Sequence, residues 1–338
     1  MKVLVTGSAG FIGGYLVEEL LAKGYEVVGV DNFSKYGKVD KSYSSHPKFS
    51  FVEGDARDPR LLTELALSCD HFIAGAARIG GISYFHEYAY DLLADNERII
   101  AASFDAALAA RKKGKLKKIT VLSSSMVFEC ATVWPTPEDH KCPPPDSTYG
   151  FQKLACEFFA KGAWEQYKLP FTICRPFNCV GIGERRALGD KDIPSGNLKL
   201  AMSHVVPDLV QKIVRGQDPV HILGDGTQVR CYTYGGDLAE GIVATLDHPA
   251  ADNETFNLST PVATTVLELA EAIWNKVHGG AKPFRWVGDP PFPYDVRRRI
   301  PDVTKSKKVL GFEARTSLSE MLDEVIPWIR GEIAHGRI

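Results

Sequence analysis

The residues that decide the fold open the chain: Met1-Lys2-Val3-Leu4-Val5-Thr6-Gly7-Ser8-Ala9-Gly10-Phe11-Ile12-Gly13. The apolar run Lys2–Thr6 predicts a buried strand, and the amphipathic stretch Phe11–Lys23, closed by Gly24, predicts a helix. The β-branched run Glu26–Val30 then predicts a second strand. A strand, a helix and a strand in this order are typical of the first unit of a parallel sheet.

The same alternation of strand and helix patterns continues to about residue 175. Further strands are expected at Phe49–Val52, His71–Ala74, Lys118–Ser123 and Pro170–Cys174, and helices at Pro59–Leu67, Leu92–Lys112 and Gly150–Tyr167. Parallel strands need a crossover between them, and a helix usually supplies it. This order therefore predicts a doubly wound parallel sheet of the Rossmann type.

Beyond Pro176 the sequence changes character. Loops become rich in glycine and proline, a long insertion runs from Gly183 to Ser203, and helices are expected at Val205–Val214, Leu238–Leu246 and Thr265–Lys276. We therefore predict an α/β protein in which residues 1–175 form the Rossmann domain. Residues 176–338 are expected to form mainly a smaller α/β domain that binds the substrate, while a segment at about 232–260 returns to the Rossmann domain.

The composition limits the partners of the chain. Its 338 residues include 40 basic and 42 acidic side chains, for a net charge of −2, so no overall basic field favours nucleic acid or an anionic membrane. The seven cysteines have no paired spacing, and no signal peptide or long apolar run is visible, so we expect a cytoplasmic protein. Cys130, His140 and Cys142 lie close together without the spacing of a zinc site, and we expect no metal.

The turn between the first strand and the first helix has the glycine spacing GxxGxxG. Gly7 allows a tight turn, Gly10 lets backbone N–H groups approach a pyrophosphate, and Gly13 lets the helix pack closely against the strand. Asp31 follows Gly13 by 18 residues, close to the place of a carboxylate that binds the adenosine ribose of a dinucleotide. A carboxylate there repels a 2′-phosphate, so the pattern predicts NAD rather than NADP.

Two later turns fit the same cofactor. Gly54-Asp55 follows the third strand, where a carboxylate can reach the adenine. Ala74-Gly75-Ala76-Ala77 follows the fourth strand, where small residues let a cofactor lie against the backbone. Each is ordinary loop chemistry when taken singly, but their order along the chain supports the dinucleotide site.

Tyr149 and Lys153 begin the helix expected after the proline-rich loop Cys142–Thr148, and at i and i+4 they share one helix face. A lysine ammonium near a phenol stabilises the phenolate, which can exchange a proton with a sugar hydroxyl. The run Ser123-Ser124-Ser125 ends a strand at the carboxyl edge of the sheet, where ligands bind in open α/β folds. A serine hydroxyl there can share that proton. The alternative is an exposed Tyr/Lys pair and a serine turn without a catalytic role.

These motifs together resemble the extended short-chain dehydrogenase/reductase family, and within it the NAD-dependent nucleotide-sugar epimerases and dehydratases. The likeness rests on the glycine turn, Asp31, the serine run, the Tyr149/Lys153 pair and Arg175-Pro176-Phe177-Asn178, and it extends to about residue 315. It implies that Tyr149 and Lys153 are the catalytic pair, that Ser124 assists them, and that NAD is held tightly. It also implies a homodimer formed through the helices at 92–112 and 150–167.

The resemblance also assigns binding residues. For NAD it implies Gly7, Gly10, Phe11, Ile12, Gly13, Asp31, Asn32, Asp55, Ala56, Ala74, Ala76, Lys153 and Phe177. For a nucleotide-diphosphate sugar it implies Arg78, Ser125, Met126, Asn178, His204, Arg230 and Arg299. Arginine forks suit a diphosphate, and we expect at least one of Arg297, Arg298 and Arg299 to face the substrate.

The residues around the expected keto intermediate select among the reactions of this family. Dehydratases of this family place an Asp and a Glu where this chain has Ser125 and Met126. In the same comparison, this chain also lacks the Glu that is usual in decarboxylases. The 3,5-epimerases, including the epimerase/reductases that make GDP-fucose, have a Cys at Met126, paired with a His or Lys at the place of His204. A thioether transfers no proton, so Met126 cannot supply the acid or base that these other reactions need. Excluding them favours a 4-epimerase.

We expect a UDP-hexose or a derivative of it as the substrate. The long insertion contains three basic residues, Arg185, Arg186 and Lys199, which could bind the carboxylate of a uronic acid. A uronate therefore stays an alternative substrate. A 3,5-epimerase/reductase and a 4,6-dehydratase are the alternatives within the family. A catalytically silent NAD-binding regulator is the alternative of another class, and Tyr149→Phe would leave its function unchanged.

Overall fold

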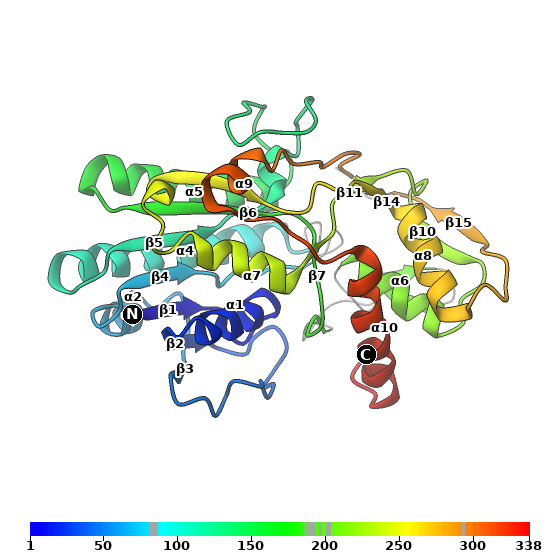
Figure 1. The fold of residues 1–338 in the computed structure, drawn as a ribbon, viewed down its shortest axis with the longest axis horizontal. Coiled ribbons are helices and arrows are strands. Elements are labelled where there is room, and N and C mark those ends of the chain that lie inside the picture. The colour runs from blue at the N-terminus through cyan, green and yellow to red at the C-terminus, as the bar shows by residue number, and fades with distance from the viewer. Residues whose placement is uncertain (81–86, 186, 188–192, 196–197, 201–203, 292–294) are drawn as a thin grey trace.

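The structure is a computed structural model that describes residues 1–338 except 81–86, 186, 188–192, 196–197, 201–203 and 292–294. Two lobes lie side by side along the long axis of the molecule (Figure 1). The larger lobe holds the N-terminus and a parallel sheet, and the smaller lobe is mainly helical.

The larger lobe is built on seven strands in the spatial order β13-β6-β5-β4-β1-β2-β3, and every neighbouring pair is parallel. The strands are β1 (Lys2–Thr6), β2 (Glu26–Asp31), β3 (Phe49–Glu53), β4 (His71–Ala74), β5 (Lys118–Leu122), β6 (Phe171–Pro176) and β13 (Glu254–Leu258). In β1 the side chains of Val3, Leu4 and Val5 are fully buried, as expected for a strand covered on both faces. The strand order reverses between β1 and β4, which confirms the predicted doubly wound fold.

Helices cover both faces of the sheet (Figure 1). On one face α1 (Phe11–Ala22) packs against α7 (Gly235–Ala244), and their apolar side chains join one buried cluster with the strands. On the other face α2 (Pro59–Ala66), α4 (Ala89–Lys113) and α5 (Thr148–Tyr167) surround a second cluster. Because the helices occupy the faces, the edge formed by the carboxyl ends of the strands is left to a ligand.

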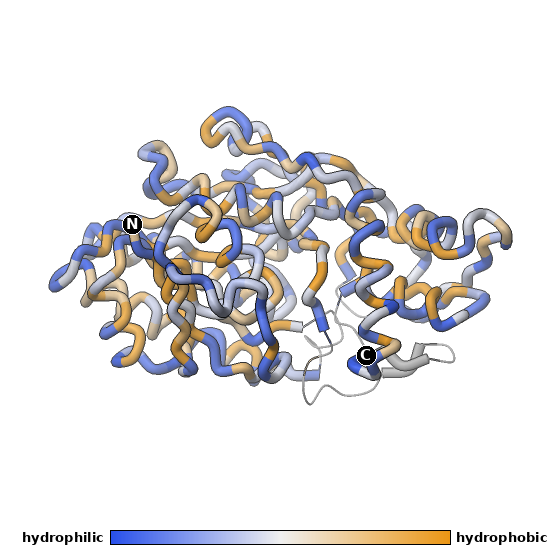
Figure 2. Tube along the Cα trace, turned by 60° about the horizontal axis from the view of Figure 1, so that its bottom comes forward, coloured by the Kyte–Doolittle hydropathy of each residue, from blue (hydrophilic) through white to orange (hydrophobic). Residues whose placement is uncertain are grey.

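The smaller lobe packs three helices together: α6 (Val205–Val214), α8 (Val266–His278) and α10 (Leu318–Ala334). The buried indole of Trp274 lies in their shared core. In Figure 2 these helices carry hydrophobic and hydrophilic stretches in alternation, as expected for helices with one buried face. Short strand pairs complete the chain: β10 (Val220–Leu223) with β15 (Trp286–Asp289), β8 (Ile193–Ser195) with β9 (Leu198–Leu200), β7 (Cys179–Val180) with β12 (Thr233–Tyr234), and β11 (Val229–Arg230) with β14 (Thr264–Thr265).

The chain returns to the larger lobe after its first passage through the smaller one. Both α7 and β13 fall within the segment 232–260 that the sequence assigns to the Rossmann domain. The helix α9 (Thr304–Leu310) also packs against α7 and β13, although the sequence analysis expects neither a helix nor a return there.

The helix α10 is likewise absent from the sequence prediction. Pro327 lies inside it, and a proline reads as a helix breaker. The capping box of Ser317 and Glu320 is the signal that marks its start. The other predicted helices and strands lie within three residues of their expected bounds.

Candidate active site

A cleft of about 630 Å³ runs along the carboxyl edge of the sheet and into the smaller lobe. Its lining includes the turns after β1, β2, β3 and β4, the serine run with the start of α5, the segment after β6, and residues from α6, β10 and the loop before α9. Open α/β folds bind ligands at this edge because strands end and helix N-termini begin there.

The turn between β1 and α1 depends on its glycines. Gly7 has a φ of +75°, a conformation that residues with a side chain rarely adopt. A Cβ on Gly13 would lie 1.9 Å from the carbonyl oxygen of Gly7, so only glycine permits this approach of helix and turn. Gly10 caps α1 without a side-chain hydrogen bond, and Phe11 and Ile12 of the first helical turn line the cleft. The turn is therefore suited to a pyrophosphate.

Asp31 lies at the end of β2 beside this turn. Its carboxylate accepts hydrogen bonds from the backbone N–H groups of Ala9 at 3.1 Å and Phe33 at 2.8 Å. Burial raises the pKa of Asp31, while the two N–H donors and the Lys41 ammonium oppose that rise. The carboxylate oxygens keep further capacity to accept hydrogen bonds, so the residues present fit the ribose of NAD.

The other expected cofactor residues lie along the same part of the cleft, with two exceptions. Those that line it are Asn32, Asp55, Ala56, Ala76 and Lys153. The Arg57 guanidinium beside Asp55 lowers the pKa of that carboxyl, so Asp55 stays ionised. The backbone N–H groups of Gly75 and Ala76 both donate to Thr6 Oγ1 at 3.2 Å, which fixes the turn after β4.

For two of the expected cofactor residues, Ala74 and Phe177, the structure shows no place in the lining of the cleft. Ala74 is the buried last residue of β4 and does not line the cleft. Phe177 is 1% exposed, and its ring packs with Phe128 and Val127 in a small core cluster away from the cleft. A motif places such residues near a site, but their side chains turn inward because burying an aromatic ring is favourable.

Tyr149 and Lys153 come together at the start of α5, where the Ser147 side chain caps the helix. Both side chains are buried, yet both line the cleft. Lys153 Nζ donates a hydrogen bond to the carbonyl oxygen of Leu122 at 2.8 Å and lies 5.9 Å from the centre of the Tyr149 ring. The end of β5 therefore holds the ammonium close to the phenol.

The three consecutive serines have different environments. Ser123 donates to the Glu157 carboxylate at 2.6 Å, so its hydroxyl belongs to the core. Ser124 Oγ accepts the backbone N–H of Met126 at 3.2 Å, which leaves its hydroxyl hydrogen able to donate to a substrate. Ser124 and Ser125 line the cleft together with Tyr149.

Met126 lies against the tyrosine. Its side chain is 6% exposed, clusters with Leu92 and Tyr149, and lines the cleft. Ile79 and Val296 pack against the same cluster. A thioether has no proton to transfer, so this wall of the cleft offers packing rather than acid/base chemistry.

Two arginines bring positive charge to the cleft. Arg230 is buried and pairs with Asp295 at 3.3 Å, while Arg299 is partly buried and donates to Ser125 Oγ at 3.4 Å. Burial lowers the pKa of both guanidinium groups, and Arg230 lowers that of Arg299 further. Arg299 Nε has no hydrogen-bond partner among the residues that the structure describes. Two guanidinium groups with one carboxylate leave a positive charge that a diphosphate can balance.

The neighbouring arginines point elsewhere. Arg297 is exposed and pairs with Asp225 at 2.9 Å. The Arg298 guanidinium lies over the ring of Trp134, 5.8 Å from its centre. Of the three consecutive arginines, Arg299 alone lines the cleft.

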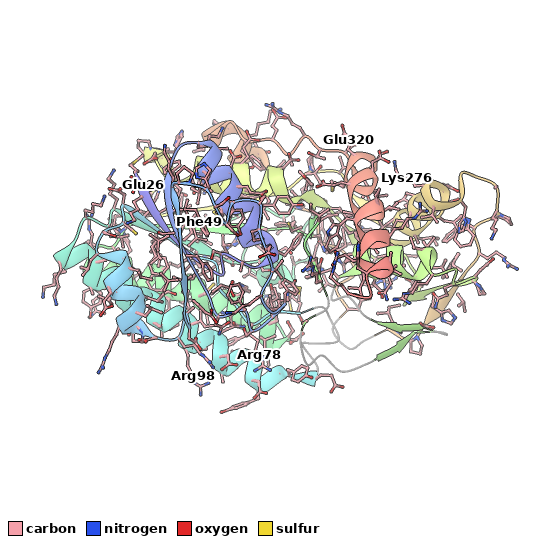
Figure 3. All side chains as sticks on the ribbon, turned by 90° about the horizontal axis from the view of Figure 1, so that it is seen from below. Glu26, Phe49, Arg78, Arg98, Lys276 and Glu320 are labelled. Atoms are coloured by element: carbon pink, nitrogen blue, oxygen red, sulfur yellow. The ribbon has the colours of Figure 1, made fainter. Side chains whose placement is uncertain are left out.

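Asn178 and Arg78 both line the cleft, but their side chains differ in whether they already bond to other residues. Asn178 has a φ of +35°, and its buried side-chain oxygen has no hydrogen-bond partner in the described ranges of the chain. Arg78 lies beside α4 (Figure 3), where it pairs with Asp95 at 2.8 Å and its backbone is bonded in both directions to the Asn96 amide. Asn178 is therefore suited to a ligand donor, whereas the charge of Arg78 is already matched.

His204 lines the cleft as expected, and its ring contacts the carboxylate of Glu184, which is 2% exposed. Glu184 could not be predicted from the sequence, because no motif links it to a histidine 20 residues away. Arg185 pairs with Glu332 at 2.9 Å and does not line the cleft. Arg186 and the side chain of Lys199 lie outside the part of the chain that the structure describes.

The far end of the cleft holds charged residues that the sequence analysis also missed. Asp208 and Lys212 on α6 pair at 2.8 Å, and Lys212 Nζ donates to the carbonyl oxygen of His221 at 3.0 Å. Burial raises the pKa of Asp208, and none of the described residues bonds to its Oδ1. The i and i+4 spacing of Asp208 and Lys212 is the sequence feature from which this ion pair could have been predicted. Buried polar groups that line a cleft are suited to the donors and acceptors of a nucleoside.

The described residues contain no group of three or more His, Cys, Asp and Glu side chains that could hold a metal ion. All seven cysteines are free. None of the helices that the structure describes is both long and apolar enough to span a membrane.

Comparison with known proteins agrees with this geometry. The sequence profile of the NAD dependent epimerase/dehydratase family matches residues 3–259. The chain belongs to this family. Its members depend on NAD, and the glycine turn and Asp31 fit that cofactor. The chain is therefore an NAD-dependent enzyme of the nucleotide-sugar epimerase and dehydratase class.

Relatives in the epimerase/dehydratase family match nearly the whole chain. A UDP-glucose 4-epimerase of Mycolicibacterium smegmatis is 30% identical over 98% of this chain and 99% of its own length. A UDP-N-acetyl-alpha-D-glucosaminuronate decarboxylase of Bacillus cytotoxicus is 29% identical over 97% of this chain and 98% of its own. Among solved structures, the UDP-glucose 4-epimerase of Thermotoga maritima with UDP-glucose has a TM-score of 0.81 and 30% identity, over 98% of this chain and 100% of that one.

Proposed function

We propose that this chain is a nucleotide-diphosphate-sugar 4-epimerase that acts on a UDP-hexose or a derivative of it. The observation that carries the proposal is the setting of Tyr149, which has Lys153 near its ring and Met126 packed against it, and which lines the cleft together with Ser124. This set supports proton exchange at one hydroxyl group. Ser124 and Met126 add no second acid or base to this set, and inversion at C4 needs none.

The proton steps follow from these positions. The Tyr149 phenolate accepts the proton of the C4 hydroxyl, while the Lys153 ammonium stabilises the phenolate charge. Ser124 donates a hydrogen bond to the C4 oxygen and keeps it within reach of the tyrosine. Bound NAD supplies the hydride acceptor at C4 and returns the hydride. Once the 4-keto group has turned over, Tyr149 gives its proton to the new hydroxyl oxygen.

The substrate needs an anchor that holds while the sugar turns over. Arg230, Arg299 and Asn178 supply it in our proposal, because two guanidinium groups balance a diphosphate and the amide adds a polar contact. The charged pair Asp208 and Lys212 then lies toward the nucleoside. Binding at this end leaves the hexose free to present either face.

Decarboxylation and dehydration have less support, although a decarboxylase is among the relatives. Met126 stands where those enzymes have a carboxylate, according to the resemblance seen in the sequence. Arg185, one of the basic residues that could bind a uronate, is paired with Glu332. We therefore favour a neutral hexose over a uronate.

Epimerisation at C3 or C5 also has less support. It requires an acid and a base on opposite faces of the sugar ring. His204 with Glu184 supplies one such group, and Met126 cannot supply the other. We assign His204 to a hydrogen bond with a substrate hydroxyl.

One experiment separates these reactions. The purified protein is incubated in D₂O with UDP-glucose, UDP-galactose, their N-acetylated forms and their uronates, and the products are followed by proton NMR. A 4-epimerase forms the C4 epimer without deuterium in the sugar, because the hydride comes back from the cofactor. Deuterium at C3 or C5, carbon dioxide release, or a 4-keto-6-deoxy product would each contradict the proposal.

The homodimer is a further part of the proposal. A groove of about 590 Å³ lies along α4 and α5, and it is lined by Phe151, Phe158 and Tyr167, which are 46%, 62% and 56% exposed. Exposed aromatic side chains on one face are typical of a protein interface. Light scattering should give the mass of a dimer, and Phe158→Glu should give that of a monomer.

We also place the protein in the cytoplasm, because all seven cysteines are free.

A further inference from the structure

The long connection between β2 and β3, residues 32–48, folds back onto the glycine turn. Three consecutive residues make the contacts: Lys41 Nζ donates to the carbonyl oxygen of Gly10 at 3.3 Å, the Ser42 hydroxyl bonds to the Glu18 carboxylate on α1, and the Tyr43 hydroxyl donates to the carbonyl oxygen of Ser8 at 2.7 Å. We call Lys41–Tyr43 the clasp.

The clasp is built into the fold. Tyr43 is 6% exposed, and its ring packs edge-on against Phe49 with the ring centres 4.9 Å apart. Lys41 lies against α1, since a Cβ on Gly14 would be 3.2 Å from its ammonium. Burial lowers the pKa of Lys41, and a cation at a helix N-terminus also opposes the helix dipole. The attractions of Glu18 and Asp31 and the bond to the turn offset these costs.

Together with Asp31, the clasp fixes three successive backbone groups of the turn. Tyr43 holds the Ser8 carbonyl, Asp31 holds the Ala9 N–H, and Lys41 holds the Gly10 carbonyl. A turn rich in glycine has many accessible conformations, and ordering it on binding weakens affinity unless the fold has ordered it beforehand. We propose that the clasp pre-forms the glycine turn and thereby sets how long NAD stays bound.

Lys41 and Tyr43 act in this proposal as positioning residues, through the turn. Tyr43→Phe removes the hydroxyl and keeps the buried ring, and Lys41→Met removes the ammonium and keeps most of the stem. Each should raise the dissociation rate of NAD about 3- to 10-fold, the effect of one net hydrogen bond. Lys41→Arg should restore slow dissociation.

The chain offers matched controls. Lys48 belongs to the same connection and donates to the carbonyl oxygen of Gly24 at 3.1 Å, but that glycine follows α1 instead of preceding it. Tyr25 carries a hydroxyl bonded to Asp247, and neither residue lines the cleft. Lys48→Met and Tyr25→Phe therefore remove the same chemical groups away from the cofactor turn, and each should leave NAD dissociation within twofold of the wild type.

The measurement is the release of labelled NAD from the loaded protein during a chase with excess unlabelled NAD, with thermal melting recorded in parallel. Faster release from the Tyr43 and Lys41 variants than from both controls supports the clasp. Release at the rate of the controls overturns it, as does a lower melting temperature with unchanged release, which indicates a structural role alone. The assay involves no sugar, so its outcome is independent of the proposed epimerase activity.

Discussion

Replacing Arg299 by methionine should weaken the binding of UDP and leave the binding of uridine unchanged. Arg299 lines the cleft, and within the described part of the chain its Nε has no hydrogen-bond partner. The hydrogen bond that the substitution removes, from the Arg299 guanidinium to Ser125 Oγ, is 3.4 Å long and therefore weak. The guanidinium is therefore available to a phosphate, and its loss should be felt mainly by ligands that carry one.

The size of the effect follows from the charges around it. A hydrogen bond to a charged group contributes about 1.5–3 kcal/mol, which corresponds to about 10- to 150-fold in affinity. Burial lowers the pKa of Arg299 and repulsion from Arg230 lowers it further, so the substitution also removes an unfavourable charge from the protein without ligand. We therefore expect the lower half of that range. The free energy of unfolding should not fall, because methionine replaces a desolvated charge.

Isothermal titration calorimetry with UDP and with uridine tests both parts of this prediction. Arg297→Met is the matched control, because Arg297 is exposed and paired with Asp225. It should change the affinity for UDP less than twofold. The reasoning is refuted if Arg299→Met binds UDP as tightly as the wild type, or if it loses affinity for uridine to the same degree.

Three further predictions address the tyrosine, the cofactor and the core. Tyr149→Phe should lower kcat by about 100- to 10,000-fold with the NAD content unchanged, as measured by turnover and by cofactor released on denaturation. Burial raises the pKa of Asp31, so on acidification bound NAD should be lost above the usual titration range of an aspartate, and Asp31→Asn should abolish this pH dependence in a retention assay. Glu157→Ala leaves the buried Arg175 guanidinium without its carboxylate and should lower the free energy of unfolding by about 3–5 kcal/mol in urea, whereas Asp225→Ala, at an exposed ion pair, should not move the midpoint.

Features that act through local spacing could be predicted from the sequence. Gly7, Gly10 and Gly13 share one turn, Asp31 ends the next strand, and the alternation of patterns predicts the parallel sheet. Periodicity and turn chemistry are properties of neighbouring residues, and a linear reading detects them.

Contacts between distant segments could not be predicted in this way. Glu184 meets His204 and Arg185 meets Glu332 only because the fold brings their segments together. The contacts of the clasp with the glycine turn could not be predicted for the same reason, since Lys41 and Tyr43 lie in a polar connection without periodicity. Phe177 shows the converse: its motif lies near the site, but packing decides that its ring faces the core.

The place of β13 in the sheet bears on how the protein is made. Its partner β6 ends at Pro176, whereas β13 ends at Leu258, about 80 residues later. Ribosomes add about 5–20 residues per second, so a nascent chain carries β6 for about 4–16 seconds before its neighbour exists. An unpaired strand edge is a template for other chains. The larger lobe therefore cannot be completed during synthesis until the chain between β6 and β13, which includes α6 and β10 of the smaller lobe, has been made. The yield of folded protein should depend on what shields the free edge of β6 in the interval.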